Sequence, residues 1–213
     1  MKEDVNARRV RMNRLEDQLA SQGYLLVAGV DEAGRGPLAG PVVAAAVILN
    51  PEDPIIGLND SKKLSAKRRS ELFEQILNRS TAHSIAYASV QEIGELNILG
   101  ATRAAMRRAV DNLNPPPDYV LYDYIQMESN MTNCEFIKKG DSVSNSIAAA
   151  SILAKVSRDR YMEELALRYP HYRFDKHKGY GTKSHYEELD RHGPCAEHRD
   201  LFLRGWREKN GIV

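Results

Sequence analysis

The chain has 213 residues, of which 42% are hydrophobic and 28% are charged, so it is long enough to bury a core and has an ordinary soluble surface. A net charge of +1 excludes a globally basic protein, so any binding of nucleic acid has to come from local patches. Two distant cysteines, Cys134 and Cys195, exclude a disulfide framework or a cysteine-rich zinc site. The N-terminus is charged and the least polar run, Pro37–Leu49, is too short to span a bilayer, so we expect a cytoplasmic protein that binds no membrane.

The first 22 residues have the spacing of a polar helix, and Gly23 predicts its end. Four arginines make this helix basic: Arg8, Arg9, Arg11 and Arg14. A solvated helix packed on the edge of the domain explains them more simply than an arm that meets an anionic partner.

The segment Val27–Leu49 predicts two apolar strands joined by a charged, glycine-rich corner. Asp31 and Glu32 end the first strand, and they diverge unless the glycines bend the chain, because adjacent strand residues point to opposite faces. The corner itself contains Gly34, Arg35 and Gly36. An acidic hairpin turn would explain the carboxylates. An arginine between glycines favours a functional corner instead, because glycine lets the backbone approach a ligand closely.

The rest of the core alternates helices and strands. Helices are expected over 66–78, 92–113 and 142–169, and strands over 82–90, 119–122 and 134–137. Ser65 is expected to cap the first of these helices. The second helix is expected to turn its apolar side chains inward: Ile93, Leu96, Leu99, Met106, Val110 and Leu113.

The helix over 142–169 carries three consecutive alanines, at 148–150, which allow close packing against a sheet. Asp141 precedes it, and an aspartate in that place is most often an N-cap. From residue 170 the chain changes character, because this tail holds five of the six histidines and the only tryptophan. His177, His185 and His198 are expected to be structural or surface residues, and two short helices are expected near 187–191 and 201–206.

Four carboxylates lie at the edges of predicted elements: Asp31, Glu32, Asp123 and Asp141. Gathered at one end of an α/β sheet, they would repel one another and raise their own pKa values. Mg²⁺ or Mn²⁺ removes this problem, and two such ions can clamp the attacking and leaving oxygens of a phosphodiester. Lys62, Lys63 and Arg35 are suited to contact the phosphates, although a solvated charge run would also explain the two lysines.

These residues belong to blocks that resemble the ribonuclease HII family, the type 2 ribonucleases H, over nearly the whole chain. The blocks are GVDEAGRGPLAGPVVAAAV, LNDSKKL, ELNILGATRAAMRRAV, KGD ahead of SIAAASILAKVSRDR, and KGYGT. The resemblance implies a ribonuclease H-like α/β fold, with a five-stranded mixed sheet flanked by helices and a C-terminal helical extension. We expect one monomeric domain over 1–213, with an N-terminal helix at 1–23, a catalytic core at 24–169 and the extension at 170–213.

The resemblance implies that Asp31, Glu32, Asp123 and Asp141 are catalytic and bind two ions, one activating water and one stabilising the leaving 3′-oxygen. Family members cleave the RNA strand of RNA–DNA hybrids. They also nick 5′ of single ribonucleotides in duplex DNA, which links them to ribonucleotide excision in DNA replication and repair. The products carry 3′-hydroxyl and 5′-phosphate ends.

The nucleic-acid contacts implied by the resemblance fall on the corner and on two other segments: Gly34, Arg35, Gly36, Lys62, Lys63 and Tyr180. The corner would contact the 2′-hydroxyl, which distinguishes RNA from DNA at one position, and Tyr180 would stack at the RNA-to-DNA junction. A loop aromatic packed on the tail is the plainer explanation of Tyr180. The family usually has Gly or Ala after the third acid, where this chain has Tyr124, and position 143, often basic or polar in relatives, is Val143.

Two other classes of function are weaker. A non-catalytic hybrid-binding module would need basic patches but not four acids, which weaken binding to phosphates. A nucleotide hydrolase using GRGPLAG as its phosphate loop would need the G-x-x-x-x-G-K-[ST] pattern, which the sequence lacks.

Overall fold

Five strands form one mixed sheet in the computed structural model, which describes residues 4–125 and 133–212. They are β1 (Val27–Ala33), β2 (Val42–Ile48), β3 (Ala82–Ala88), β4 (Tyr119–Asp123) and β5 (Cys134–Ile137), in the order β3-β2-β1-β4-β5. β2 is antiparallel to β1 and β3, whereas β4 is parallel to β1 and β5. The expected five-stranded mixed sheet is confirmed.

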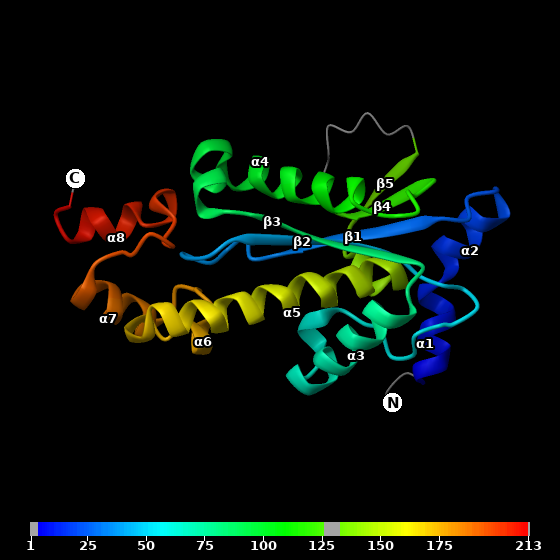
Figure 1. The fold of residues 1–213 in the computed structure, drawn as a ribbon, viewed down its shortest axis with the longest axis horizontal. Helices are drawn as coiled ribbons and strands as arrows, with labels where there is room; N and C mark the ends of the chain where they lie inside the picture. Colours follow the sequence, from blue (N-terminus) through cyan, green and yellow to red (C-terminus); the bar gives the residue numbers. More distant parts are fainter. Residues whose placement is uncertain (1–3, 126–132, 213) are drawn as a thin grey trace.

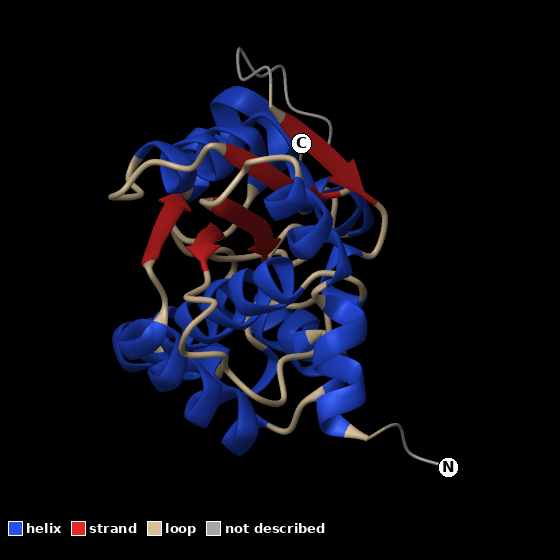
Figure 2. Cartoon of the chain, turned by 90° about the vertical axis from the view of Figure 1, so that its right-hand side faces the viewer, coloured by secondary structure: helices blue, strands red, loops and turns tan. Residues whose placement is uncertain are grey.

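Helices cover both faces of the sheet (Figure 1; Figure 2 gives the perpendicular view). Helix α4 (Val90–Asp111) lies on one face, and α5 (Asn145–Arg168) with α3 (Ala66–Arg79) lies on the other. Ser65 caps α3 as expected, since its Oγ accepts the N–H of Arg68 at 3.2 Å. The core therefore has three layers, with the sheet in the middle.

Alternation along β1 assigns its side chains to two different cores. Ala28 and Val30 pack toward α4, among residues such as Met106. Val27 packs on the other face, with Ile147 at the start of α5. Because strand side chains alternate, Gly29 and Asp31 share the α5 face, and Glu32 belongs to the α4 face.

Helix α5 approaches β1 so closely that only glycine fits at position 29. A Cβ atom at Gly29 would stand 2.1 Å from the carbonyl carbon of Ser146 and 2.2 Å from the nitrogen of Ile147. The alanines 148–150 of α5 are completely buried beside this contact. Small residues on both elements thus set the distance between helix and sheet.

The N-terminal segment is two helices rather than the single one expected, α1 (Val5–Met12) and α2 (Arg14–Ser21). They join at Asn13, whose φ of −92° and ψ of 0° change the direction of the chain, and Gly23 ends the pair with φ +95°. Glu16 fastens them to α5, because its Oε1 accepts the Ser144 hydroxyl at 2.6 Å and the Ser146 N–H at 3.0 Å.

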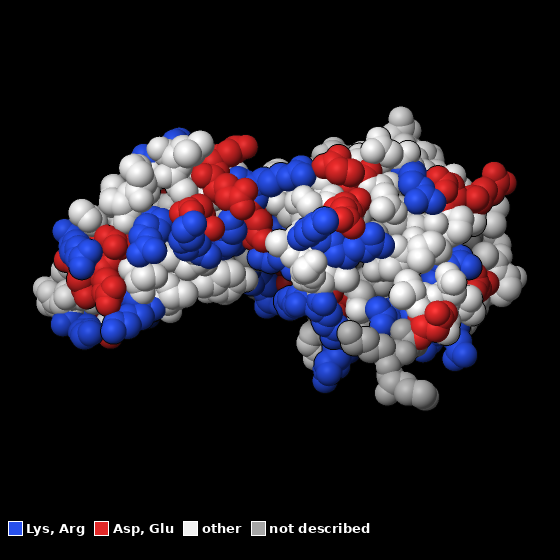
Figure 3. Space-filling model, turned by 90° about the horizontal axis from the view of Figure 1, so that it is seen from below, with Lys and Arg blue, Asp and Glu red and all other residues white. Residues whose placement is uncertain are grey.

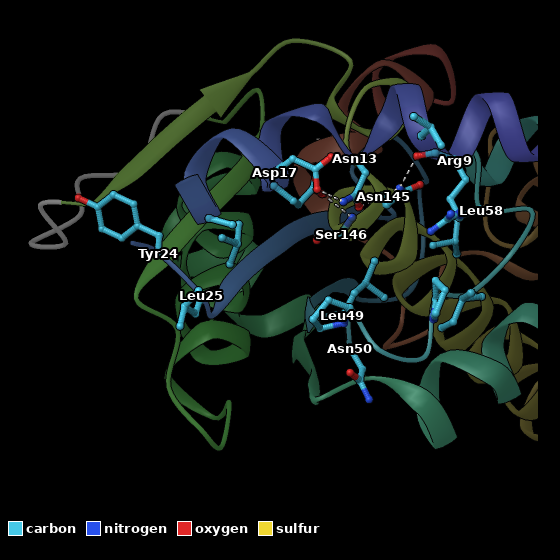
Figure 4. A pocket seen from close by; sticks show the side chains of 17 residues that line it. Arg9, Asn13, Asp17, Tyr24, Leu25, Leu49, Asn50, Leu58, Asn145 and Ser146 are labelled. Atoms are coloured by element: carbon cyan, nitrogen blue, oxygen red, sulfur yellow. Dashed lines mark hydrogen bonds between the residues drawn. The ribbon is translucent and has the colours of Figure 1, made fainter. Parts of the chain in front are cut away.

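A cavity of about 560 Å³ lies beside this junction, under the N-terminal helices (Figure 4). Asn145 at the start of α5 donates to the carbonyl of Arg9 at 3.0 Å on its wall. None of the four expected catalytic acids lines this cavity. The cavity is therefore separate from the acids.

The expected inward face of α4 is wrong for two leucines. Leu96 and Leu99 are 44% and 39% exposed, whereas Ile93, Met106, Val110 and Leu113 are buried as expected. Asn97 interrupts the helix with φ +58° and ψ 174°, so the turns before and after it do not share one phase. Alanines at 101, 105 and 109 occupy the buried stripe beyond the break.

In β3 the buried side chains are Ala82, Ala86 and Ala88, while Tyr87, in the opposite phase, is 41% exposed. Small residues therefore form the inner face of this edge strand, beneath α4.

The C-terminal segment forms a helical extension at the end of the molecule opposite α2 (Figure 1). Its helices are α6 (Phe174–His177), α7 (Lys183–His192) and α8 (Arg204–Lys209). His185 and His198 are buried and join through their Nε2 atoms at 3.0 Å, and burial lowers the pKa of each to about 4. These histidines are neutral at neutral pH and structural, as expected.

Within the described residues no helix is long and apolar enough to cross a bilayer. Acidic and basic side chains are interspersed on the face seen from below (Figure 3), as the small net charge leads one to expect.

Replacing Gly29 by alanine is expected to destabilise the protein by about 3 kcal/mol or more, because backbone has to move to admit the new methyl group. Gly94→Ala is the matched control: Gly94 lies in α4 with nothing within 4 Å of the added Cβ, so about 0.5–1 kcal/mol of stabilisation is expected. Urea unfolding of both variants measures the difference. Equal stabilities would contradict the close contact of α5 and β1.

Candidate active site

Two acids meet because β1 and β4 are parallel neighbours. Their register pairs Val30 with Tyr122, which places Asp31 beside Asp123 at the same end of both strands. Both side chains fall on the α5 face of the sheet, in step with Gly29 and Leu121. Asp123 ends β4 as predicted, whereas Asp31 lies inside β1, which continues to Ala33 instead of ending at Val30.

The third acid, Asp141, lies in the turn between β5 and α5. Lys139 takes a left-handed conformation (φ +59°), and Gly140–Ser142 then forms a single 3-10 turn that contains Asp141. The N–H of Gly140 donates to Asp123 Oδ1 at 2.8 Å, which ties this turn to the end of β4. The plainer alternative for Asp141, an N-cap of α5, does not hold, because Ser144 is the N-cap and α5 begins at Asn145 rather than at the expected residue 142.

Asp31, Asp123 and Asp141 each place a carboxylate oxygen within 4.8 Å of the others. Asp31 is 7% exposed and Asp141 8%. Burial raises the pKa of all three carboxyls, and repulsion adds to it; for Asp31 that repulsion comes from Glu32, Asp123 and Asp141. The cluster is thus costly to ionise without a cation.

Glu32 lies at the side of this cluster rather than within it. Its Oε1 faces Arg35 Nη1 at 3.5 Å, and its Oε2 is buried without a hydrogen-bond partner. Burial raises the pKa of Glu32, Arg35 lowers it, and Asp123 is near enough to raise it. Glu32 is still paired within β1, opposite Ala44, and its strand position belongs to the other face, so it lies beside the three-acid cluster and not in it.

The donor set fits hard divalent cations. Three clustered carboxylates and one unpartnered buried carboxylate oxygen offer only oxygen ligands, which Mg²⁺ and Mn²⁺ prefer, and no described histidine or cysteine joins them.

A fourth aspartate, Asp60, also borders the cluster, where its carboxyl contributes to raising the pKa of Asp141. It was missed because its first role is local: Asp60 Oδ1 accepts the N–H of Lys62 at 2.9 Å and caps the turn Ser61–Lys63. An acid within LNDSKKL, beside two lysines, was the signal available in the sequence.

The two lysines of that turn lie at the same site, and both are exposed. Lys62 is close enough to lower the pKa values of Glu32, Asp123 and Asp141, although burial still leaves each raised. Lys63 Nζ lies 3.1 Å from the hydroxyl of Ser142, next to Asp141. Two positive charges thus border the acids.

The connection from β1 to β2, Gly34–Pro41, is called the corner loop below. Gly34 has φ +98°, a conformation that residues with a side chain rarely adopt. A Cβ there would also stand 2.1 Å from Arg158 Nε, so both the backbone conformation and the lack of space require glycine. Arg35 and Gly36 are exposed at its tip. Tyr180, 45% exposed, lies against it, since a Cβ on Gly36 would be 3.9 Å from the Tyr180 ring.

Tyr124 adopts φ +44°, in the region that favours glycine, immediately after Asp123. Its N–H donates to the carbonyl of Ile137 at 3.1 Å, so β4 and β5 stay joined through this turn. Its ring is 65% exposed. The large residue is thus accommodated by turning its side chain to solvent. Val143 is 37% exposed.

A mixed sheet of this order, with two acids side by side on its parallel central strands, defines a nuclease of the ribonuclease H-like fold that works with divalent cations. The chain belongs to the ribonuclease HII family, because the family model described as Ribonuclease HII matches residues 28–209. It is therefore an endoribonuclease with ribonuclease H activity on RNA–DNA hybrids.

Relatives support the same assignment. The chain is 52% identical to Ribonuclease HII of Caldicellulosiruptor bescii, over 89% of this chain and 92% of that protein. It is 59% identical to Ribonuclease HII of Delftia acidovorans, over 83% and 75%. The crystal structure of ribonuclease H2 from Pyrococcus horikoshii OT3 has the same fold, with a TM-score of 0.72, 24% identity and coverage of 88% and 99%. RNase HII of Archaeoglobus fulgidus, solved as a complex with PCNA, gives a TM-score of 0.68, 26% identity and coverage of 87% and 94%.

The raised pKa of Asp31 has a consequence for stability without metal. Below about pH 4 the carboxyl is protonated in both the folded and the unfolded chain, and as the pH rises its ionisation costs the folded state more. Asp31→Asn removes that cost. In EDTA we expect the melting temperature of the variant minus that of the unsubstituted protein to be near zero at pH 4 and positive at pH 7, by roughly 2–4 °C for each kcal/mol regained.

Adding Mg²⁺ or Mn²⁺ at pH 7 is expected to raise the melting temperature of the unsubstituted protein and to leave Asp31→Asn nearly unchanged, because the ion binds the folded cluster. Calorimetry at both pH values measures this. A variant less stable than its parent at pH 7 in EDTA contradicts the picture of a self-repelling buried cluster.

Proposed function

We propose that this enzyme hydrolyses the RNA strand of RNA–DNA hybrids and also nicks 5′ of a single ribonucleotide in duplex DNA, leaving 3′-hydroxyl and 5′-phosphate ends. Asp31, Glu32, Asp123 and Asp141 hold two divalent cations, Mg²⁺ or Mn²⁺, in the active complex. The observation that carries the proposal is the meeting of three carboxylates from distant segments within 4.8 Å, beside an exposed glycine–arginine corner.

The cations would activate water and stabilise the leaving oxygen at the scissile phosphate. The protein's own part is to hold the acids in place before substrate arrives. Asp123 is fixed by the Gly140 N–H, Asp141 by its 3-10 turn, and Asp31 by its place in the middle of the sheet. Prearranged ligands of this kind require little reorganisation during the reaction.

The corner loop and Tyr180 recognise the substrate. Arg35 reaches from the loop to Glu32 and is half-exposed, so it links the corner to the acids. Main-chain groups at Gly34 and Gly36 can approach a sugar closely, and the 2′-hydroxyl is the group that separates ribose from deoxyribose. The exposed ring of Tyr180 beside Gly36 offers a stacking surface for a base or sugar at the RNA-to-DNA junction. Lys62 and Lys63 add phosphate contacts.

The test is cleavage of a labelled duplex that carries one ribonucleotide, with Mg²⁺ present and the cut mapped at nucleotide resolution. We expect one cut 5′ of the ribonucleotide and none in EDTA. Asp31→Asn and Asp141→Asn are each expected to lower kcat by roughly a hundredfold or more, because each removes a charged ligand of the cations.

Asp53→Asn is the control, because Asp53 pairs with Arg79 in a surface loop outside the cluster and should leave kcat unchanged. Near-native cleavage by either cluster variant would show that the acids are misassigned. A cut elsewhere in the duplex would remove the proposed recognition of single ribonucleotides while leaving hybrid cleavage intact.

A further inference from the structure

Arg199, in the C-terminal extension, lies beneath the corner loop and is 1% exposed. Its guanidinium donates to five main-chain carbonyls of that loop at 2.7–3.1 Å: those of Gly34, Arg35, Pro37, Gly40 and Pro41. A guanidinium has five N–H groups, so this side chain commits its whole donor capacity to one loop.

Arg158 of α5 supports the same loop from a second side and is also 1% exposed. It donates to the carbonyls of Pro41 and Ala39, each at 3.0 Å. Its third bond, at 2.9 Å, reaches the carbonyl of Lys178 and so connects the loop to the segment that carries Tyr180. The guanidinium itself lies 5.9 Å from the centre of the Tyr180 ring.

The main chain of the extension adds to this attachment. The N–H of Arg199 donates to the carbonyl of Leu38 at 2.8 Å, and the N–H of Gly40 donates to the carbonyl of Glu197 at 2.9 Å. Ala39 and His198 form an isolated antiparallel bridge between these donors. Residues 197–199 therefore run antiparallel beside the corner loop.

Both guanidiniums are charges in the interior, and within the described residues neither has a carboxylate at salt-bridge distance. Burial lowers the pKa of Arg199 to about 9 and of Arg158 to about 10, so both stay charged at neutral pH. An apolar core would hold a loop at lower cost than two unpaired buried cations. Their positive charge instead favours an anion on the open side of the loop.

The exposed side of the corner loop presents hydrogen-bond donors, whereas its inner side presents carbonyls. With the carbonyls turned toward Arg199 and Arg158, the partially negative ends of the peptide dipoles lie inside. At the exposed tip, the N–H groups of Arg35 and Gly36 donate to no described acceptor. Successive free N–H groups in a bent backbone form a site for anionic or hydroxyl oxygen.

We propose that Arg199, assisted by Arg158, is a positioning residue that gives the enzyme its discrimination between ribose and deoxyribose. It does not touch the substrate; it holds the carbonyls of the corner loop inward and so presents the N–H groups of the tip to the sugar and its phosphate. This inference rests on the proposed function of the corner loop. It also makes the C-terminal extension a working part of substrate selection.

The experiment measures the ribose preference of binding, defined as Kd for an all-DNA duplex divided by Kd for the same duplex with one ribonucleotide. It uses the full chain carrying Asp141→Asn, with Mg²⁺, so that substrate is not consumed. Adding Arg199→Lys keeps the charge but replaces the planar five-donor fork by a three-donor ammonium. We expect the preference to fall by roughly fivefold or more, through weaker binding of the ribonucleotide duplex, with all-DNA binding changed by less than about twofold.

Arg204→Lys is the matched control, because Arg204 is exposed in the same extension, and it should leave the preference unchanged. A merely structural role for Arg199 would lower the folded fraction and weaken both duplexes alike, which leaves their ratio unmoved. In the active enzyme, the expected change is a raised KM at nearly constant kcat.

An unchanged preference in folded Arg199→Lys overturns the proposal. Should that variant not fold, Arg158→Lys decides the matter in the same assay: a smaller loss of preference supports the proposal, and no loss overturns it. If the Asp141→Asn parent itself shows no ribose preference, the proposed role of the corner loop fails, and this outcome is distinct from a preference that survives the change at Arg199.

Discussion

The close contact of α5 with β1 at Gly29 determines where the acids can meet. Asp31 is two residues further along the same face of β1, and Asp141 lies in the turn just before α5. Since the helix packs on bare backbone, the turn is drawn down to the sheet, and its Gly140 N–H reaches Asp123. A larger residue at position 29 would lift the start of α5 and carry Asp141 away from its partners.

The charged groups around this contact form two sets, one of acids and one of buried arginines. The acids raise one another's pKa values in a buried setting, which makes the empty cluster unfavourable and a bound cation correspondingly favourable. On the other side of the exposed corner, Arg158 and Arg199 are buried cations satisfied by carbonyls instead of carboxylates. The acids and the two buried guanidiniums are thus separated by one loop, and within the described residues no ion pair joins the two groups.

The sequence was sufficient for what depends on local pattern. It predicted the five strands, the cap at Ser65 and the position of Asp123 at the end of its strand, because apolar runs and capping residues are recognised within a few residues. It ended the first strand too early, since β1 continues through Asp31 and Glu32 to Ala33. It misplaced Leu96 because a single left-handed residue reset the helical phase. The sequence did not indicate that Arg199 supports the corner loop, since its hydrogen bonds to carbonyls some 160 residues away depend on tertiary packing and follow no local spacing of residues. The roles of the individual site residues stay predictions.

Whether acids from three segments form one site for divalent cations is tested most directly by an anomalous difference map from crystals of the unsubstituted protein grown with Mn²⁺. We expect the strongest peak among the carboxylates of Asp31, Asp123 and Asp141, within ligand distance of each. A map from fully active protein whose manganese lies elsewhere, with no density among these three side chains, would contradict the account.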